Sequence, residues 1–295
     1  MSFKTTVRVF IKEWVLPPMI LYFLNHWIFS VALRHHFSTV RLFKKRSRKL
    51  FVLANGPSLN NDYEKYKNEI FRNDTVVMNM FALSQLFEQI KPEAYVLSDP
   101  VYFKSIVSLS TNYIENIRRL RKAFIDKVNW HMTLFVPDSA NGCEFLNVIG
   151  CNAYISVRYY NSRPGIDGHF GLWLLKNEKT SPPAQTVATV AAGIGIILGY
   201  EEIYMLGIDT SMHTMMRVNQ RTNEVYFENA HFYGTRNEKA YKEGDENQAY
   251  SVAFFLECVA KMFDGYDRIR KFADYCGVRV INASSFSWVD SLERR

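Results

Sequence analysis

The stretch KLFVLANGPSLNND, residues 49–62, decides how this chain folds. Its hydrophobic run, residues 50–54, stops abruptly at the four residues NGPS, 55–58. A short apolar run bounded by turn residues is typical of a buried strand. Glycine lets the backbone approach a ligand closely, and the segment after it can present N–H groups to a phosphate. A simple turn explains the same residues, and the glycine spacing fits neither GxGxxG nor a P-loop, so NGPS alone leaves both interpretations open.

Short apolar runs alternate with helical stretches on the C-terminal side of this segment. Strands are predicted at FVLA (51–54), TVVMNM (75–80), AYVLS (94–98), MTLFV (132–136), EIYMLGI (202–208) and VRVINAS (278–284). Helices are predicted at 84–90, 114–124, 186–200 and 248–275. Because alternating strands and helices indicate βαβ units, the expected fold class is α/β, with a Rossmann-like, mostly parallel sheet and helices on both faces.

Polar residues follow four of the predicted strands. NGPS follows the first strand, Asn79 ends the second, Ser98-Asp99-Pro100 follows the third, and Gly207-Ile208-Asp209-Thr210 follows the fifth. Ligands of open α/β sheets bind beyond the carboxyl ends of the strands. Four polar strand ends together therefore predict a binding site, although no single one would.

The composition is that of a folded protein, because 48% of the 295 residues are hydrophobic. The formal net charge is +7, and basic residues crowd the segment RLFKKRSRK, residues 41–49. The four cysteines show no CxxC pair or other metal spacing, which favours free thiols in a reducing compartment. No recognition-helix pattern accompanies the basic segment, so nucleic acid is not an expected partner.

An apolar segment, WVLPPMILYFLNHWIFSVAL at residues 14–33, has the length of a membrane span. Two prolines and a central Asn-His pair favour an interfacial or re-entrant anchor instead, with the basic segment against anionic lipid. A helical hairpin buried against the main domain is the alternative. We therefore expect a membrane-associating segment at 1–48, contacting the membrane surface through residues 10–49, and a nucleotide-binding catalytic domain at 49–295.

Several of these motifs, taken in order, carry a resemblance to a known family. They are NGPSL, the Asn79 strand end, the Ser-Asp-Pro step, LGYEEIYMLGID (198–209) and HFYG (231–234). Over roughly Leu50 to Thr235 the chain resembles the bacterial sialyltransferases of glycosyltransferase family 42. It is similar, more distantly, to flagellin-glycosylation domains and the archaeal pterin pyrophosphokinases. The resemblance implies a GT-A-like variant of the nucleotide-binding fold.

The resemblance also implies roles for individual residues. His231 would be the catalytic general base, a role that suits imidazole because it titrates near neutral pH. A structural loop histidine is the alternative for His231. Asn55, Gly56 and Ser58 would line the nucleotide phosphate and ribose, and Asn79 would contact the CMP moiety. The complete expected nucleotide- and donor-binding set is Asn55, Gly56, Pro57, Ser58, Asn79, Ser98, Asp99, Thr186, Gly207, Asp209 and Tyr233.

The chain departs from the family pattern at three positions. Asp99 replaces an asparagine, Thr186-Val187-Ala188 replaces a serine-containing step, and Ser211 replaces a tyrosine. A carboxylate at Asp99 would repel the carboxylate of a nonulosonate donor. A nucleotide sugar is therefore better supported as the donor than sialic acid itself. The expected donor is another, sialic-acid-like CMP-activated acid sugar, or a UDP- or GDP-linked sugar.

Residues 211–230 are polar and lack a sustained period, so they are predicted to form a lid over the donor. Arg217 and Arg221 in this segment are candidates to neutralise the leaving phosphate. Weaker site candidates are Arg158-Tyr159-Tyr160 and His169. No DxD motif follows a strand in the metal-binding manner, so metal-independent chemistry without a cofactor is expected.

The leading function is an inverting glycosyltransferase that acts on a lipid-linked surface glycan at the cytoplasmic face of a bacterial inner membrane, bound peripherally or monotopically. A homo-oligomer is an option, since such assemblies are common in the family. The second hypothesis is a Mg²⁺-dependent ATP pyrophosphokinase-like enzyme, with Asp99 and Asp209 as metal ligands. The third is a non-enzymatic, membrane-bound binding protein that kept the fold.

Overall fold

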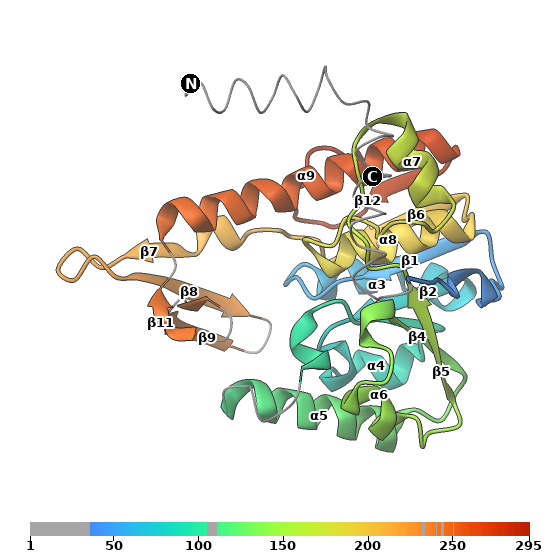
Figure 1. The fold of residues 1–295 in the computed structure, drawn as a ribbon, viewed down its shortest axis with the longest axis horizontal. Coiled ribbons are helices and arrows are strands. Elements are labelled where there is room, and N and C mark those ends of the chain that lie inside the picture. The colour runs from blue at the N-terminus through green and yellow to red at the C-terminus, as the bar shows by residue number, and fades with distance from the viewer. Residues whose placement is uncertain (1–35, 105–110, 232–233, 240, 243–244, 250) are drawn as a thin grey trace.

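A computed structural model of the chain describes residues 36–104, 111–231, 234–239, 241–242, 245–249 and 251–295 (Figure 1). Its centre is an eight-stranded sheet in the order β13-β12-β6-β1-β2-β3-β4-β5. The strands are β1 (Lys49–Leu53), β2 (Asp74–Met78), β3 (Ala94–Val96), β4 (Met132–Pro137), β5 (Ile155–Tyr160), β6 (Glu202–Leu206), β12 (Arg279–Asn282) and β13 (Glu293–Arg294). Every neighbouring pair is parallel, so the predicted α/β, mostly parallel sheet is confirmed.

Helices cover both faces of this sheet. On one face lie α3 (Leu59–Arg72), α4 (Leu86–Ile90), α5 (Thr111–Lys127) and α6 (Glu144–Ile149), and on the other α7 (Gly168–Lys176), α8 (Val187–Leu198) and α9 (Val252–Cys276). The alternation of side chains along β1 shows why two layers form. Phe51 and Leu53 pack into the core with α3, whereas Leu50 and Val52 pack into the core with α8. Continuous apolar runs are therefore the signature of strands buried on both faces.

Short 3₁₀ helices connect several of these elements. They are η2 (Val40–Leu42), η3 (Phe81–Leu83), η4 (Pro100–Phe103), η6 (Asp138–Ala140) and η7 (Met212–Thr214). Two of them, η3 and η4, follow β2 and β3 directly and so shape the strand ends at which the site is expected.

All six strands predicted from apolar runs are present, but β5 was not predicted. Four of its six residues are only partly buried, and only Tyr160 is fully buried. As an edge strand it lacks the apolar run by which the other strands were found. Residues 158–160, which were weak site candidates, therefore belong to a strand.

The predicted lid region contains strands. Beyond η7, an antiparallel sheet is formed by β7 (Met216–Val218), β8 (Val225–His231) and β9 (Gly234–Lys239), and the pair β10 (Tyr241–Lys242) and β11 (Asp245–Ala249) follows. Figure 1 shows these strands as a lobe beside the parallel sheet, next to the N-terminal half of α9. The Phe227 and Phe255 rings meet at 4.7 Å and attach β8 to that helix.

Helix α9 joins the lobe to the main sheet because it is 25 residues long, or about 37 Å at 1.5 Å per residue. Its N-terminal half packs on the lobe through Phe255, Val259 and Met262. Its C-terminal half packs on the parallel sheet through Ile269 and Phe272. The predicted helix 248–275 starts later than expected, since the Ser251 hydroxyl caps it by accepting from the Phe254 N–H at 3.2 Å.

Residues 1–35 of the predicted membrane-associating segment 1–48, which include the apolar stretch 14–33, lie outside the described residues. Among the described residues, no helix is both long enough and apolar enough to cross a bilayer. The basic segment that follows, residues 41–49, is held partly by the protein's own carboxylates. Arg41 pairs with Glu178 at 2.5 Å, and Lys49 pairs with Glu202 at 3.0 Å.

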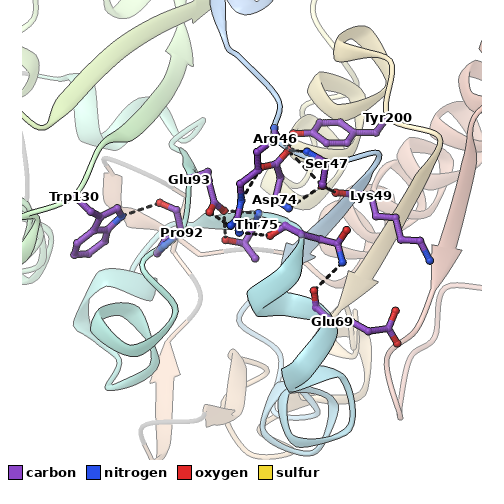
Figure 2. Close-up of polar contacts among 11 residues, drawn as sticks. Arg46, Ser47, Lys49, Glu69, Asp74, Thr75, Pro92, Glu93, Trp130 and Tyr200 are labelled. Carbon is purple, nitrogen blue, oxygen red and sulfur yellow. Dashed lines mark hydrogen bonds and ion pairs between the residues drawn. The ribbon is translucent and has the colours of Figure 1, made fainter.

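Asp74 is the main anchor of this basic segment (Figure 2). Its carboxylate is 1% exposed and accepts from the N–H groups of Arg46 at 3.0 Å and Ser47 at 3.2 Å. The hydroxyl of Tyr200 donates to the same oxygen at 2.8 Å, and burial raises the pKa of that phenol. The Arg46 guanidinium also pairs with Glu93 at 2.7 Å. These contacts fix where the chain enters β1, and so where β1 ends at NGPS.

Candidate functional site

The order of the strands brings the predicted strand-end residues together. The chain builds outward from β1 to β5 and then returns to place β6 on the other side of β1. The position between β1 and β6 is therefore a topological switch point, where parallel sheets bind their ligands. Loops that follow β12, β6, β1, β2 and β3 meet at this edge, because these five strands are neighbours.

The loops after β1 and β6 touch at two glycines. The Gly56 N–H donates to the Gly207 carbonyl at 2.9 Å. A Cβ atom on Gly56 would lie 2.2 Å from Asp209 Oδ1, and Gly207 has a φ of +67°. Both positions thus require glycine, since the first needs close approach and the second a left-handed backbone. Gly56 of NGPS is therefore needed for contact with the loop after β6. The sequence had suggested a simple turn or a phosphate-binding loop, and neither interpretation included this contact.

Ser58, Asp209 and Asp62 lock these loops together. The Ser58 N–H donates to Asp209 Oδ2 at 3.1 Å, and Ser58 Oγ lies 2.5 Å from Asp209 Oδ1 and 3.1 Å from Asp62 Oδ2. The Asp62 carboxylate also accepts from the N–H groups of Gly207 at 3.0 Å and Ser285 at 2.6 Å. The side chains of Ser58 and Asp209 therefore bind each other, and the Ser58 N–H is already occupied by a carboxylate.

Burial raises the pKa of the Asp209 carboxyl, and the nearby charge of Asp62 adds to the rise, while the Ser58 hydrogen bonds oppose it. The hydroxyl of Ser58 has one proton to donate, but its oxygen lies between two carboxyls. Both contacts are satisfied when Asp209 is protonated and donates to Ser58, which then donates to Asp62.

Asn79 presents a free acceptor at the end of β2. Its φ is +51°, and its backbone is held by an N–H bond to the Val96 carbonyl at 3.4 Å and by the Tyr95 hydroxyl, which donates to its carbonyl. Its side-chain Oδ1 is buried without a hydrogen-bond partner. Next to it, exposed Asn55 donates from Nδ2 to the Met78 carbonyl at 3.2 Å. A buried acceptor without a partner is unfavourable, so a ligand N–H or O–H would be stabilised there.

The residues after β3 are fixed by local contacts. The Tyr160 hydroxyl donates to Ser98 Oγ at 2.9 Å, which ties the end of β5 to the end of β3. Asp99 Oδ1 accepts from the Val101 N–H at 2.9 Å and caps η4. Ser98 retains a hydroxyl proton for a ligand, whereas the Asp99 carboxylate is partly committed to the cap.

Thr186 reaches the same edge as the N-cap of α8, where its Oγ1 accepts from the Thr189 N–H at 3.2 Å. After β6, Thr210 Oγ1 lies 3.4 Å from the hydroxyl of Tyr266. Burial raises the pKa of Tyr266, whose hydroxyl also interacts with Thr186. The start of α8, the loop after β6 and α9 are thus joined at one buried phenol.

The remaining predicted residues lie elsewhere. His231 is the last residue of β8 and pairs with Gly234, so it belongs to the lobe and not to the strand-end group. Tyr233 lies outside the described residues. Arg217 is also in the lobe and donates to the Thr214 carbonyl at 2.7 Å.

His169 lines a cavity of about 640 Å³ beside α7, and Arg158 lines one of about 240 Å³ at the opposite edge of the sheet.

Trp288 and His213 were not predicted. The Trp288 N–H donates to the Asp209 carbonyl at 3.0 Å, and its indole is 48% exposed. The His213 ring packs edge-on against that indole at 4.6 Å. Phe286 beside it is also exposed. The sequence held a signal for this group, because SSFSW (284–288) directly follows a predicted strand, as the other site loops do.

Among the described residues, no group of three or more His, Cys, Asp or Glu side chains could hold a metal ion. Asp99 and Asp209, the ligands expected for a magnesium-dependent enzyme, follow β3 and β6, which are separated by β1 and β2, and they accept hydrogen bonds from Val101 and Ser58. The site as described is thus a polar edge built of amide, hydroxyl and backbone groups around two buried carboxyls.

Comparisons with known proteins concern the fold. No protein-family model matches the chain, and no curated protein matches it. Among solved structures it is similar to the MAf glycosyltransferase from Magnetospirillum magneticum AMB-1, at 15% identity and a TM-score of 0.48. That match covers 88% of this chain and 35% of the other, so the chain spans about a third of its length. The resemblance to the sialyltransferases of family 42 stays a prediction.

Proposed function

We propose that this chain is an inverting glycosyltransferase whose nucleotide-sugar donor binds across the loops at residues 55–58 and 207–210. The observation that carries the proposal is the unpartnered Asn79 Oδ1 at the end of β2, one strand away from the switch point where Gly56 contacts Gly207. A free buried acceptor at that place suits an amino or hydroxyl group of a nucleoside.

The electrostatics of the loops favour a nucleoside monophosphate leaving group, as in a CMP-activated acid sugar. Asp209 already occupies the Ser58 N–H, and Asp62 lies against the same hydroxyl. A diphosphate would bring more negative charge next to these carboxyls than a monophosphate does. A UDP- or GDP-linked sugar is therefore the less favoured donor.

The chemistry is a single displacement. A base removes the proton of an acceptor hydroxyl, whose oxygen bonds to the anomeric carbon as the bond from that carbon to the phosphate oxygen breaks. His231 is our proposed base, because imidazole suits proton removal near neutral pH. It would act from the lobe across the strand-end site. The proposed acceptor is a lipid-linked surface glycan. The enzyme would reach it at the cytoplasmic face of the membrane, to which residues 10–49 would bind.

The test is donor turnover by the full-length chain in EDTA, with release of CMP from a panel of CMP-activated acid sugars as the readout. The proposal expects turnover without a metal, and a fall of at least about 100-fold in His231→Ala, since general-base catalysis contributes roughly 10²–10⁴-fold. Turnover that appears only with Mg²⁺ and ATP would replace this proposal by pyrophosphoryl transfer. Turnover by UDP- or GDP-sugars alone would keep the transferase and change the donor.

A further inference from the structure

A cavity of about 640 Å³ lies between α7 and the C-terminal half of α9, and none of the strand-end residues at 55–58, 79, 98–99 and 207–210 lines it. Figure 1 shows α7 lying against that half of α9. Its walls are the loop at 165–168, the first part of α7, residues 180–183 and α9 from Asp264 to Tyr275. Ligand pockets in proteins measure about 300–1,000 Å³, so the volume fits a small organic molecule.

Thr180 gives this cavity a polar group that needs a partner. The residue is 1% exposed and lines the cavity. Its Oγ1 atom is buried and has no hydrogen-bond partner. Because buried hydroxyls in native structures are almost always paired, an unpaired one in the wall of a cavity calls for a partner there.

The Thr180 hydroxyl and the Arg268 guanidinium converge on one point. Gly165 has no side chain, and a Cβ built on it would lie 3.3 Å from Arg268 Nη2 and 3.8 Å from Thr180 Oγ1. The Ser181 carbonyl oxygen would lie 3.7 Å from the same Cβ. The cavity wall at Gly165 therefore brings a cation and a hydroxyl donor close to one point, beside one backbone acceptor. Charged and hydroxyl donors together are the typical partners of an oxyanion.

The start of α7 adds backbone donors. This helix has nine residues, begins at Gly168 and has no side-chain hydrogen bond at its N-cap, Asp167. Gly168, His169 and Gly171 from its first turn line the cavity. The first N–H groups of a helix have no partner within the helix, and the helix dipole favours negative charge there.

Carboxylates also line the cavity, but they lie at its exposed rim. The side chains of Asp167 and Asp274 are 89% and 67% exposed, and Asp264 is exposed as well. The contact of Arg268 with Asp167 is 3.5 Å long, and an ion pair this accessible to water contributes little. Buried Leu175 and Pro183 give the cavity apolar wall. A ligand with one anionic end and an uncharged body therefore matches these surroundings.

We propose that this cavity is a second ligand site that binds an organic phosphate. The phosphate oxygens accept from Thr180, Arg268 and the first turn of α7, and Lys271 supplies a further positive charge at the opening. The uncharged body of the ligand lies along Leu172, Leu175 and Pro183. This site does not depend on the proposed transferase activity, because it uses none of the strand-end residues.

The test is calorimetric titration of the full chain with inorganic pyrophosphate as the probe. Arg268→Gln and Thr180→Val are each expected to weaken binding about tenfold or more, since each removes a hydrogen bond to a charged group. Arg270→Gln is the matched control. Arg270 carries the same charge on the same helix, pairs with Asp267 and Asp274, and does not line the cavity. It should change the affinity less than about twofold.

Three outcomes overturn the proposal: no binding of pyrophosphate, equal loss in Arg268→Gln and Arg270→Gln, or loss in Asn79→Gly with none in Arg268→Gln. The last outcome would place the phosphate at the strand ends. Thr180→Val also serves as a folding control, because it removes an unsatisfied buried hydroxyl and should leave the free protein at least as stable.

A second arm identifies the source of the phosphate. Sedimentation with vesicles of phosphatidylcholine, with and without phosphatidic acid, compares the wild-type chain with Arg268→Gln. A loss of phosphatidic-acid-dependent binding in the variant supports a lipid headgroup as the ligand. Unchanged vesicle binding, together with the pyrophosphate result, supports a soluble phosphate ester.

Discussion

Ser58 and Asp209 lie 151 residues apart in the chain, yet the Ser58 N–H donates to Asp209 Oδ2 at 3.1 Å. A second contact joins the Ser58 hydroxyl to the other oxygen of the same carboxyl. The pair ties the start of α3 to the loop after β6, on the two sides of the switch point. Any ligand at this edge therefore meets two loops that are already fixed to each other, which lowers the cost of ordering them on binding.

Asp209→Asn should leave the protein folded and remove one source of its pH dependence. The pKa of the Asp209 carboxyl is raised in the folded state, so its stabilising effect is complete below the unfolded value of 3.8 and is lost as pH rises through the folded value. An amide at this position can accept from the Ser58 N–H and donate to its hydroxyl. In urea unfolding between pH 4 and 8, the variant should stay within about 1 kcal/mol of wild type near pH 7 and lack this slope.

Asp62→Asn is the matched comparison. Asp62 accepts from three donors, Ser58, Gly207 and Ser285, so an amide would turn an N–H group toward one of them. The variant should lose about 2 kcal/mol of unfolding free energy. Equal losses in Asp62→Asn and Asp209→Asn near pH 7 would contradict the view that Asp62, which accepts from two backbone N–H groups, fixes the loops more firmly than Asp209, which accepts from one.

Asn79→Gly should separate ligand binding from stability. Glycine adopts the positive φ of Asn79 without strain, so unfolding free energy should hold or rise, while the free side-chain acceptor is lost. We expect nucleotide affinity to fall about tenfold in calorimetric titration. Lys91→Gly is the control, because Lys91 has a φ of +50° at the end of α4. It should raise stability and leave affinity unchanged, and a similar loss of affinity in both variants would refute a direct role for Asn79.

Much of the architecture could be predicted from the sequence, because strands buried on both faces leave continuous apolar runs. The strand ends were therefore found with their polar residues, including Asn79 and Asp209. The order of the strands could not be read in this way, since placing β6 beside β1 depends on packing between segments far apart in the chain. The partners of buried charges were missed for the same reason, as with Asp62 and Ser285, 223 residues apart.

Partial exposure explains why other elements, such as β5, were not predicted from the sequence. The edge strand β5 has only one fully buried residue, so no apolar run marked it. The strands of the predicted lid are short or mostly polar and pack on α9, through contacts such as Phe227 with Phe255. The position of Trp288 after a predicted strand could have marked it as a site residue. Its link to Asp209 is a hydrogen bond between backbone atoms, which the identities of the side chains do not reveal.

Asp74→Asn should destabilise the fold without touching the site. Asp74 is 1% exposed and its Oδ2 accepts from Arg46, Ser47 and Tyr200 (Figure 2). Breaking such a buried, charged network should cost about 3 kcal/mol in urea unfolding. Asp126→Asn, which removes an exposed ion pair with Lys122, should cost less than about 0.5 kcal/mol. A small effect of Asp74→Asn would contradict the view that this carboxyl fixes the entry to β1.

Trp288 should report nucleotide binding through its fluorescence. Its exposed indole lies next to the Asp209 loop, where a base or sugar ring of the ligand can stack on it. We expect nucleotide to quench the protein's tryptophan fluorescence, and Trp288→Phe to abolish most of that change. Trp173→Phe is the control, since Trp173 is 47% exposed on α7, away from the strand ends. Quenching that persists in Trp288→Phe would place the ligand elsewhere.

The most direct test of the central claim is a thermal-shift panel of CMP, UDP, GDP, ADP and ATP, each with and without Mg²⁺, on the wild-type chain and Asn79→Gly. At about 100 times its dissociation constant a ligand adds roughly 2.7 kcal/mol of stability, or several degrees for a protein of this size. We predict stabilisation of the wild type by CMP, unchanged by Mg²⁺ and largely lost in Asn79→Gly. No shift with any nucleotide, or a shift that Asn79→Gly leaves intact, would contradict nucleotide binding at the switch point.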